Sequence, residues 1–211
     1  MTQIRNKSKE ARDNVPAPKA KDTSAISDSQ SFLDRLEQPV RWQTILICLA
    51  IFIVAMGFNL YRIGDPSIWF DEALSVTRAQ QSLPVLFKIV SVTQPNMALY
   101  YFLLHFWLSF TRLFGLNATE AVVRFPSAVF SALGSVILYF LARRFFSSLI
   151  AIIAALLYLL NTLQLTYAQV TRAYTLQLLF LALSWYVLCV LFSSDLSRRC
   201  ARNWWICFIL A

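Results

Sequence analysis

The sequence has few charged residues and a single histidine. Only 14% of its 211 residues are charged, 58% are hydrophobic, and the mean hydropathy is +0.57. An ordinary soluble domain has about 25% charged residues, so this composition excludes that class and indicates a protein that crosses a membrane several times. The lone His105 has no second histidine with which to build a metal site.

The cysteines and the basic residues exclude further classes. None of the 4 cysteines has CxxC spacing and most lie in apolar segments, so we interpret them as small buried side chains, not as a disulfide or metal set. The net charge of +8 could indicate a nucleic-acid partner, but no nucleic-acid motif is present. The basic residues stand at the ends of apolar runs, where topology signals and lipid phosphates account for them.

The apolar runs predict an all-α integral membrane protein. We expect four complete spans and a truncated fifth, at residues 43–60, 121–141, 148–165, 176–192 and 204–211. Because the last run is too short to cross a bilayer, the sequence reads as the N-terminal part of a longer protein. Residues 1–40 are polar and predict a disordered cytoplasmic tail, whereas residues 41–211 form one transmembrane domain.

Two further segments are expected on the outer surface of the membrane. Residues 72–92 are amphipathic, and residues 97–114 are crowded with aromatic side chains that favour the headgroup level. If residues 97–114 lie on the surface instead of spanning, Arg143 and Arg144 fall on the inner side, as does the basic cluster near residue 200. The positive-inside rule therefore predicts a cytoplasmic N-terminus and an outer loop after the first span.

Two adjacent carboxylates, Asp71 and Glu72, follow the first span in the stretch WFDEALSVTR. A carboxylate beside a membrane needs either the water interface or a partner, so such acids are functional candidates. The alternative is structural: Asp71 would cap a surface helix and Glu72 would lie in its first turn. The third span brings a second polar patch, TYAQVTRAY, to the same outer face.

Four motifs appear in a fixed order along the chain: WFDEA, QPNMALYYFLLHFW, EAVVRFPSAVFSALGSVILYFLARRFF and LNTLQLTYAQVTRAYTLQ. Over about residues 42–192 this order resembles the N-terminal part of GT-C-type membrane glycosyltransferases. That class uses polyprenyl-phosphate sugars and includes protein O-mannosyltransferases and the aminoarabinose transferase of lipid A.

The resemblance implies a catalytic acid in the first outer loop, at Asp71, with Glu72 orienting the acceptor or the helix. A guanidinium matches phosphate oxygens, so Arg172 is the expected partner of the donor phosphate and Arg78 the second choice, although Arg172 could simply snorkel. The substrate-binding candidates are Gln169, Tyr174, Tyr100 and Tyr101. The alternative for the last two is that they anchor the chain at the interface.

The implied reaction moves a sugar from a polyprenyl-phosphate donor to the hydroxyl of an unidentified lipid, glycan or protein acceptor. It would take place on the outer face of a bacterial plasma membrane. The expected partners of the protein include the lipid bilayer, and nucleic acid is not among them. No cofactor is required, although Asp71 and Glu72 could hold a divalent cation that bridges the donor phosphate.

Two departures from the family pattern leave other functions open. Relatives read HPPLYY where this chain keeps only Pro95, and YSQEARMY where it has Val170 in place of the acid. The chain could therefore be an inactive fragment or an accessory subunit of the same fold. A transporter is the remaining alternative, but transporters place ionisable groups near the bilayer midplane, whereas Asp71 follows the first span.

Overall fold

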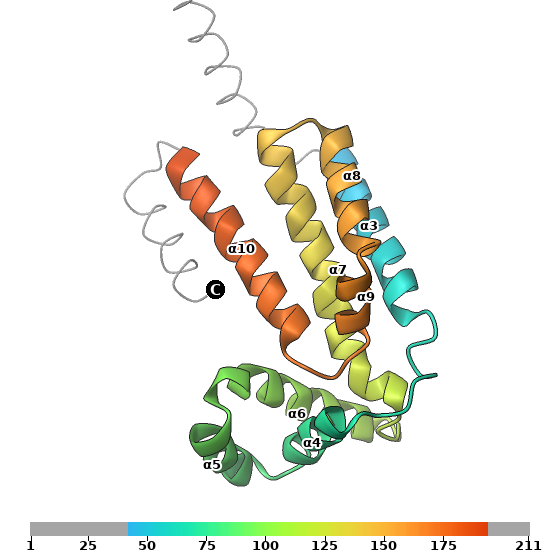
Figure 1. Ribbon diagram of the computed structural model, residues 1–211, viewed down its shortest axis with the longest axis vertical. Coiled ribbons are helices and arrows are strands. Elements are labelled where there is room, and N and C mark those ends of the chain that lie inside the picture. The colour runs from blue at the N-terminus through green and yellow to red at the C-terminus, as the bar shows by residue number, and fades with distance from the viewer. Residues whose placement is uncertain (1–41, 194–211) are drawn as a thin grey trace, which may run out of the picture. The chain divides into compact units, whose positions relative to one another are not determined.

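The computed structural model describes residues 42–193, all of whose regular elements are helices, and this confirms the all-α prediction. The predicted tail at 1–40 and the truncated span at 204–211 lie outside the described residues. The helices, labelled as in Figure 1, are α3 (Trp42–Leu60), α4 (Phe70–Ala79), α5 (Leu83–Thr93), α6 (Ala98–Leu113), α7 (Glu120–Phe145), α8 (Ser148–Leu159), α9 (Thr162–Ala168) and α10 (Tyr174–Ser193). A 3₁₀ turn, η1 (Pro95–Met97), precedes α6.

Three of these helices, α3, α7 and α10, are long and apolar enough to cross a membrane. The predicted span at 148–165 is two helices, α8 and α9, which meet at an angle of 64° and count as a fourth span only if they are taken together. The break has a local cause: the Asn161 side chain accepts hydrogen bonds from the backbone N–H groups of Leu163 (3.0 Å) and Gln164 (3.3 Å) and so caps α9. The protein is a multi-pass membrane protein.

Helix α7 is the centre of the bundle and packs against α3, α8 and α10 (Figure 1). Small buried residues such as Ala55, Ala132 and Ala155 line its interfaces. A Cβ added to Gly134 would lie 3.1 Å from the Tyr158 hydroxyl, so this glycine makes room for the tyrosine. Lipid supplies no hydrophobic force between helices, so such close packing is what holds membrane helices together.

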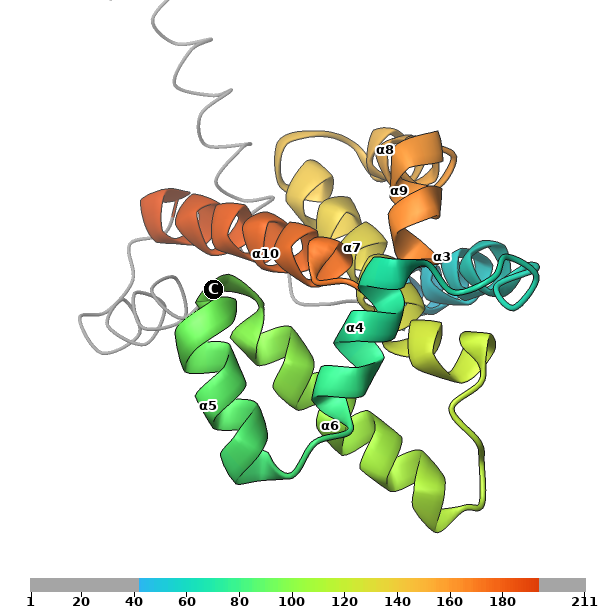
Figure 2. The same cartoon turned by 60° about the horizontal axis from the view of Figure 1, so that its bottom comes forward.

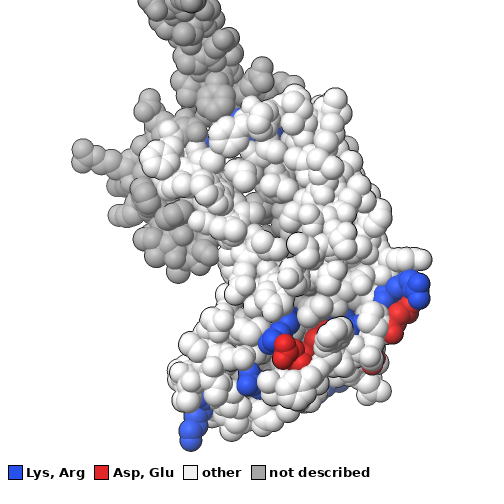
Figure 3. Space-filling model, in the orientation of Figure 1, with Lys and Arg blue, Asp and Glu red and all other residues white. Residues whose placement is uncertain are grey.

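Helices α4, α5 and α6 form a layer across one end of the bundle (Figures 1 and 2). On the face drawn in Figure 3, charged side chains gather on this layer, whereas the long side of the bundle is almost free of them. Helix α4 buries Glu72, Ser75 and Ala79, which lie on one stripe of the helix. The packing of α4 therefore points Glu72 into the protein.

The layer is fixed to α7 where α7 contains a proline. Pro126 has no N–H, so it leaves the carbonyl of Val122, four residues earlier, without its helical donor. The indole N–H of Trp107 on α6 donates to this carbonyl at 2.8 Å, and the Trp107 ring stacks on Phe125 at 5.0 Å. The carbonyl that the proline leaves free in α7 thus becomes an attachment point for α6.

Candidate active site

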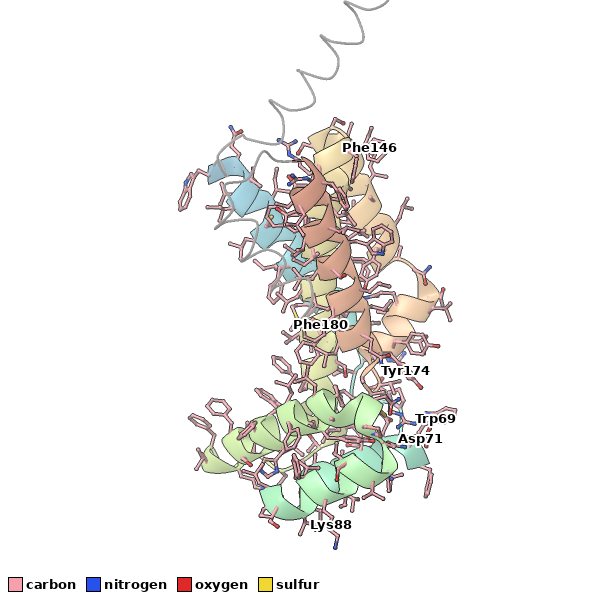
Figure 4. The ribbon with its side chains drawn as sticks, turned by 90° about the vertical axis from the view of Figure 1, so that its left-hand side faces the viewer. Trp69, Asp71, Lys88, Phe146, Tyr174 and Phe180 are labelled. Carbon is pink, nitrogen blue, oxygen red and sulfur yellow. The ribbon has the colours of Figure 1, made fainter. Side chains whose placement is uncertain are left out.

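Helix α4 presents its two carboxylates to opposite surroundings. Successive residues on a helix are about 100° apart, so Asp71 and Glu72 cannot share a face. The Glu72 side chain is 0% exposed, whereas that of Asp71 is 61% exposed. Figure 4 shows Asp71 at the edge of the helical layer, on the same side as Trp69 and Tyr174.

Glu72 is bound by four hydrogen bonds. Arg124 of α7 donates to both carboxylate oxygens, from Nε to Oε1 at 2.9 Å and from Nη2 to Oε2 at 2.7 Å. The backbone N–H of Thr171 donates to Oε1 at 2.7 Å and that of Trp69 donates to Oε2 at 3.2 Å. Such a two-pronged guanidinium contact is the strongest form of ion pair between side chains.

Arg124 is 1% exposed, and its remaining donors are also satisfied. They reach the backbone carbonyls of Ile63 (2.9 Å), Pro66 (2.8 Å) and Ser67 (3.2 Å) in the segment between α3 and α4. The Glu72–Arg124 pair therefore ties together α4, α7, the α3–α4 segment and the turn between α9 and α10.

Two opposing effects act on the Glu72 carboxyl. Burial by itself raises its pKa, but the hydrogen bonds from Arg124, Thr171 and Trp69 favour the charged form, and the net pKa lies below its ordinary value of 4.5. A buried carboxylate that stays charged and has both oxygens occupied is a poor proton acceptor. The geometry gives Glu72 a structural part in this site.

Asp71 has a different cation. Its Oδ2 accepts a hydrogen bond from Nη2 of Arg172 at 2.6 Å, and Arg172, in the turn before α10, is only 13% exposed. The other guanidinium nitrogen, Nη1, lies 3.6 Å from the sulfur of Met97. The open edge of the layer thus carries an accessible carboxylate beside a largely enclosed cation.

The other two candidates near this turn have different surroundings. The Gln169 side-chain amide donates to the carbonyls of Asn59 (3.2 Å) and Tyr61 (2.9 Å), and so joins the α9–α10 turn to the end of α3. Tyr174 is 42% exposed, and its ring lies 4.8 Å from that of Tyr167. Of the two, only Tyr174 offers an open surface, two residues after the Arg172 that binds Asp71.

Arg78 and the two tyrosines lie in a neighbouring network. Arg78 Nη1 donates to Oε1 of Gln94 at 2.6 Å and to the hydroxyl of Tyr101 at 3.2 Å, and Tyr101 itself donates to Gln94 at 2.5 Å. Tyr100 is buried and hydrogen-bonded to Ser127 at 3.0 Å, and its burial raises the pKa of its hydroxyl. Both tyrosine rings are enclosed by protein, and neither offers a face to a ligand.

Sequence reasoning missed Arg124, which lies near the start of the span predicted at 121–141. The available signal was a cation within the apolar stretch EAVVRFPSAV, since an ionisable group at such a place needs a partner. Asp71 and Glu72 were the candidate acids, but only the fold assigns Arg124 to the second.

The described residues also bear on the divalent cation considered above. Among residues 42–193 no group of three His, Cys, Asp or Glu side chains could hold a metal ion. Both Glu72 oxygens accept hydrogen bonds. A cation at Asp71 would therefore draw its other ligands from the substrate and water.

The comparison with protein families decides the class. The family model described as dolichyl-phosphate-mannose-protein mannosyltransferase matches residues 102–211. The chain belongs to this family. It is accordingly a membrane glycosyltransferase of the GT-C type. The matched residues of this mannosyltransferase-family protein include Arg124 and Arg172. Asp71 and Glu72 precede the match. No curated protein and no solved structure matches the chain.

Proposed function

We propose that this protein transfers a sugar from a polyprenyl-phosphate donor to an acceptor hydroxyl, with Asp71 as the general base and Arg172 as the cation for the donor phosphate. The family description names dolichyl-phosphate-mannose and protein, so mannose is the first sugar to test and a protein hydroxyl the first acceptor. Tyr174, exposed on the same side of the protein as Asp71, is the candidate for contact with the substrate.

The observation that carries this proposal is the pair of Asp71 and Arg172 at 2.6 Å, at the end of a membrane bundle. The exposed carboxylate is accessible to an acceptor from water. The guanidinium is mostly enclosed, and an enclosed cation interacts more strongly with phosphate than one in bulk water does. A lipid-linked sugar phosphate has its tail in the bilayer and its head at this level, so the two groups suit its geometry.

The proposed chemistry is a single displacement. The acceptor oxygen forms a bond to the anomeric carbon while Asp71 takes the hydroxyl proton. The bond between that carbon and the phosphate oxygen breaks, and its electron pair stays on the oxygen. The donor phosphate carries one negative charge and the released lipid phosphate gains a second, which Arg172 stabilises as it develops.

We further propose that this site faces the outside of the cell, or an equivalent compartment, with the N-terminus in the cytoplasm. Arg143 and Arg144 lie in the last turn of α7, whereas Glu120 begins that helix beside the α4–α6 layer. The positive-inside rule supports an inner position for the arginine end.

A transfer assay in membranes tests the proposal. The full-length protein is supplied with polyprenyl-phosphate mannose and hydroxyl-bearing peptides, and wild type is compared with Asp71→Asn. We expect Asp71→Asn to lower transfer on the order of 100-fold or more, as loss of a general base does. Asp65→Asn is the matched control, because Asp65 pairs with Arg62 in an exposed position of the segment just before α4. Transfer that survives Asp71→Asn would refute the assignment of the base.

The alternative, an accessory subunit without activity, is favoured by Val170, which stands where relatives have an acid. Val170 lies in the turn directly before Thr171 and Arg172. If wild type transfers no sugar but Val170→Glu does, the chain has lost its activity and serves another role. If wild type transfers sugar, the acid is dispensable here.

A further inference from the structure

The two groups that the proposed mechanism needs are bonded to each other. Asp71 must be free to accept a proton, and Arg172 must be free to hold a phosphate, yet Nη2 of Arg172 donates to Oδ2 of Asp71 at 2.6 Å. Each group therefore occupies the position that the other's ligand would take.

Among the described residues, Asp71 is the anionic contact of Arg172; the other contact is the sulfur of Met97, a weak acceptor. Glu72 is adjacent in sequence but cannot replace Asp71, because both of its oxygens are held by Arg124 and by backbone N–H groups. An incoming phosphate thus competes with a single carboxylate.

The two partners differ in how freely they can move. Arg172 is 13% exposed and lies in a turn that is anchored by two residues just before it, Thr171 to Glu72 and Gln169 to the end of α3. Asp71 is 61% exposed. Exchange at Arg172 therefore needs only a rotation of the Asp71 side chain into water.

We infer that the donor phosphate replaces Asp71 at Arg172, so that donor binding itself releases the base and the donor binds before the acceptor is activated. This inference rests on the proposed function. In the free enzyme Oδ2 of the carboxylate is occupied by the guanidinium of Arg172; in the donor complex the phosphate takes over the guanidinium and the carboxylate is free.

The exchange of Asp71 and phosphate at Arg172 also accounts for release of the lipid phosphate after transfer. After transfer Asp71 holds the acceptor's proton and is neutral, so it does not compete while Arg172 holds the doubly charged lipid phosphate. When Asp71 loses that proton to water, its carboxylate again competes for Arg172 and favours release of the product. No oxidant, reductant or further reactant is needed.

Binding of a lipid phosphate without sugar tests the inference apart from catalysis. The full-length protein in lipid nanodiscs is titrated with radiolabelled polyprenyl phosphate, for wild type, Asp71→Asn, Asp71→Ala and the control Asp65→Asn. Removing an ion-pair competitor that is partly exposed should tighten binding about two- to fivefold in both Asp71 variants. Asp65→Asn removes the same charge from the segment just before α4 and should leave binding within experimental error of wild type.

The outcomes separate the two proposals. Tighter binding in both Asp71 variants, but not in Asp65→Asn, supports the exchange. Unchanged or weaker binding in either Asp71 variant overturns it, and so does an equal gain in Asp65→Asn, which would reflect general electrostatic attraction. If wild type binds no lipid phosphate while remaining monodisperse and folded, the donor assignment in the proposed function fails as well.

Discussion

Helix α4 takes part in two carboxylate–arginine ion pairs, one buried inside the protein and one at its exposed edge. Inside, Glu72 and Arg124 are 0% and 1% exposed and every oxygen and guanidinium nitrogen involved has a partner. At the edge, Asp71 is 61% exposed and shares a single contact with Arg172. The two carboxylates are neighbours in sequence, yet one is suited to holding helices together and the other to exchanging ligands.

This difference teaches how the fold can keep the proposed base in a defined place. A buried ion pair is costly to desolvate and even more costly to break, so it fixes geometry more than it adds net stability. An exposed pair contributes little to stability and is easily exchanged. Glu72 also holds the Thr171 N–H, next to Arg172, so the inner pair sets the spacing of the outer one.

The largest effect should come from breaking the inner pair. Arg124→Ala leaves a charged carboxylate buried without its partner, and we expect a loss of about 3–5 kcal/mol in the free energy of unfolding. Thermal unfolding of the purified protein in detergent measures it. Arg62→Ala, which breaks an exposed pair in the segment between α3 and α4, should change stability by less than about 1 kcal/mol. Equal effects of the two substitutions would contradict the contrast between inside and edge.

Removing the arginine of the Asp71–Arg172 pair should leave stability nearly intact but impair sugar transfer. Arg172→Ala removes the cation that we propose stabilises the leaving phosphate, and we expect kcat to fall on the order of 100- to 1,000-fold. Arg172→Lys keeps the charge but not the planar, two-pronged contact, so it should recover part of this loss. If Arg172→Ala unfolds the protein instead, the residue belongs to the framework.

The pH dependence of stability distinguishes the inner pair further. Since folding lowers the pKa of Glu72 below 4.5, its contribution is fully present above the unfolded-state pKa and is lost as the pH falls through the folded-state pKa. Wild type should therefore lose stability on acidification from neutral pH to about pH 3. Glu72→Gln cannot titrate, so its unfolding temperature should fall less over this range. Parallel curves for the two proteins would contradict this assignment.

The smallest effect is expected at Gln169, which was predicted to bind substrate but joins the α9–α10 turn to the end of α3. Gln169→Ala removes two hydrogen bonds to the carbonyls of Asn59 and Tyr61. We expect a loss of about 1 kcal/mol in unfolding free energy and little change in KM for the donor. A large rise in KM with unchanged stability would make Gln169 a substrate contact instead.

Much of the helical framework could be predicted from the sequence. Long apolar runs predict spans because a bilayer requires about 20 apolar residues, and α3, α7 and α10 follow the runs closely. The break between α8 and α9 was not predicted, because Asn161 is a single polar residue in a run that is otherwise apolar enough for one span. The partners of Gln169 and the enclosure of Tyr100 were not predictable, because they depend on chain segments remote in sequence.

The sequence by itself determined a multi-pass membrane glycosyltransferase with an acidic pair after its first span, because hydrophobicity and motif order are properties of the chain alone. Which acid lies inside was decided only by the tertiary structure. Neighbouring side chains on a helix point about 100° apart, and the packing of α4 turns Glu72 inward to Arg124, 52 residues further along the chain. That packing leaves Asp71 largely exposed beside Arg172, at the proposed site of transfer.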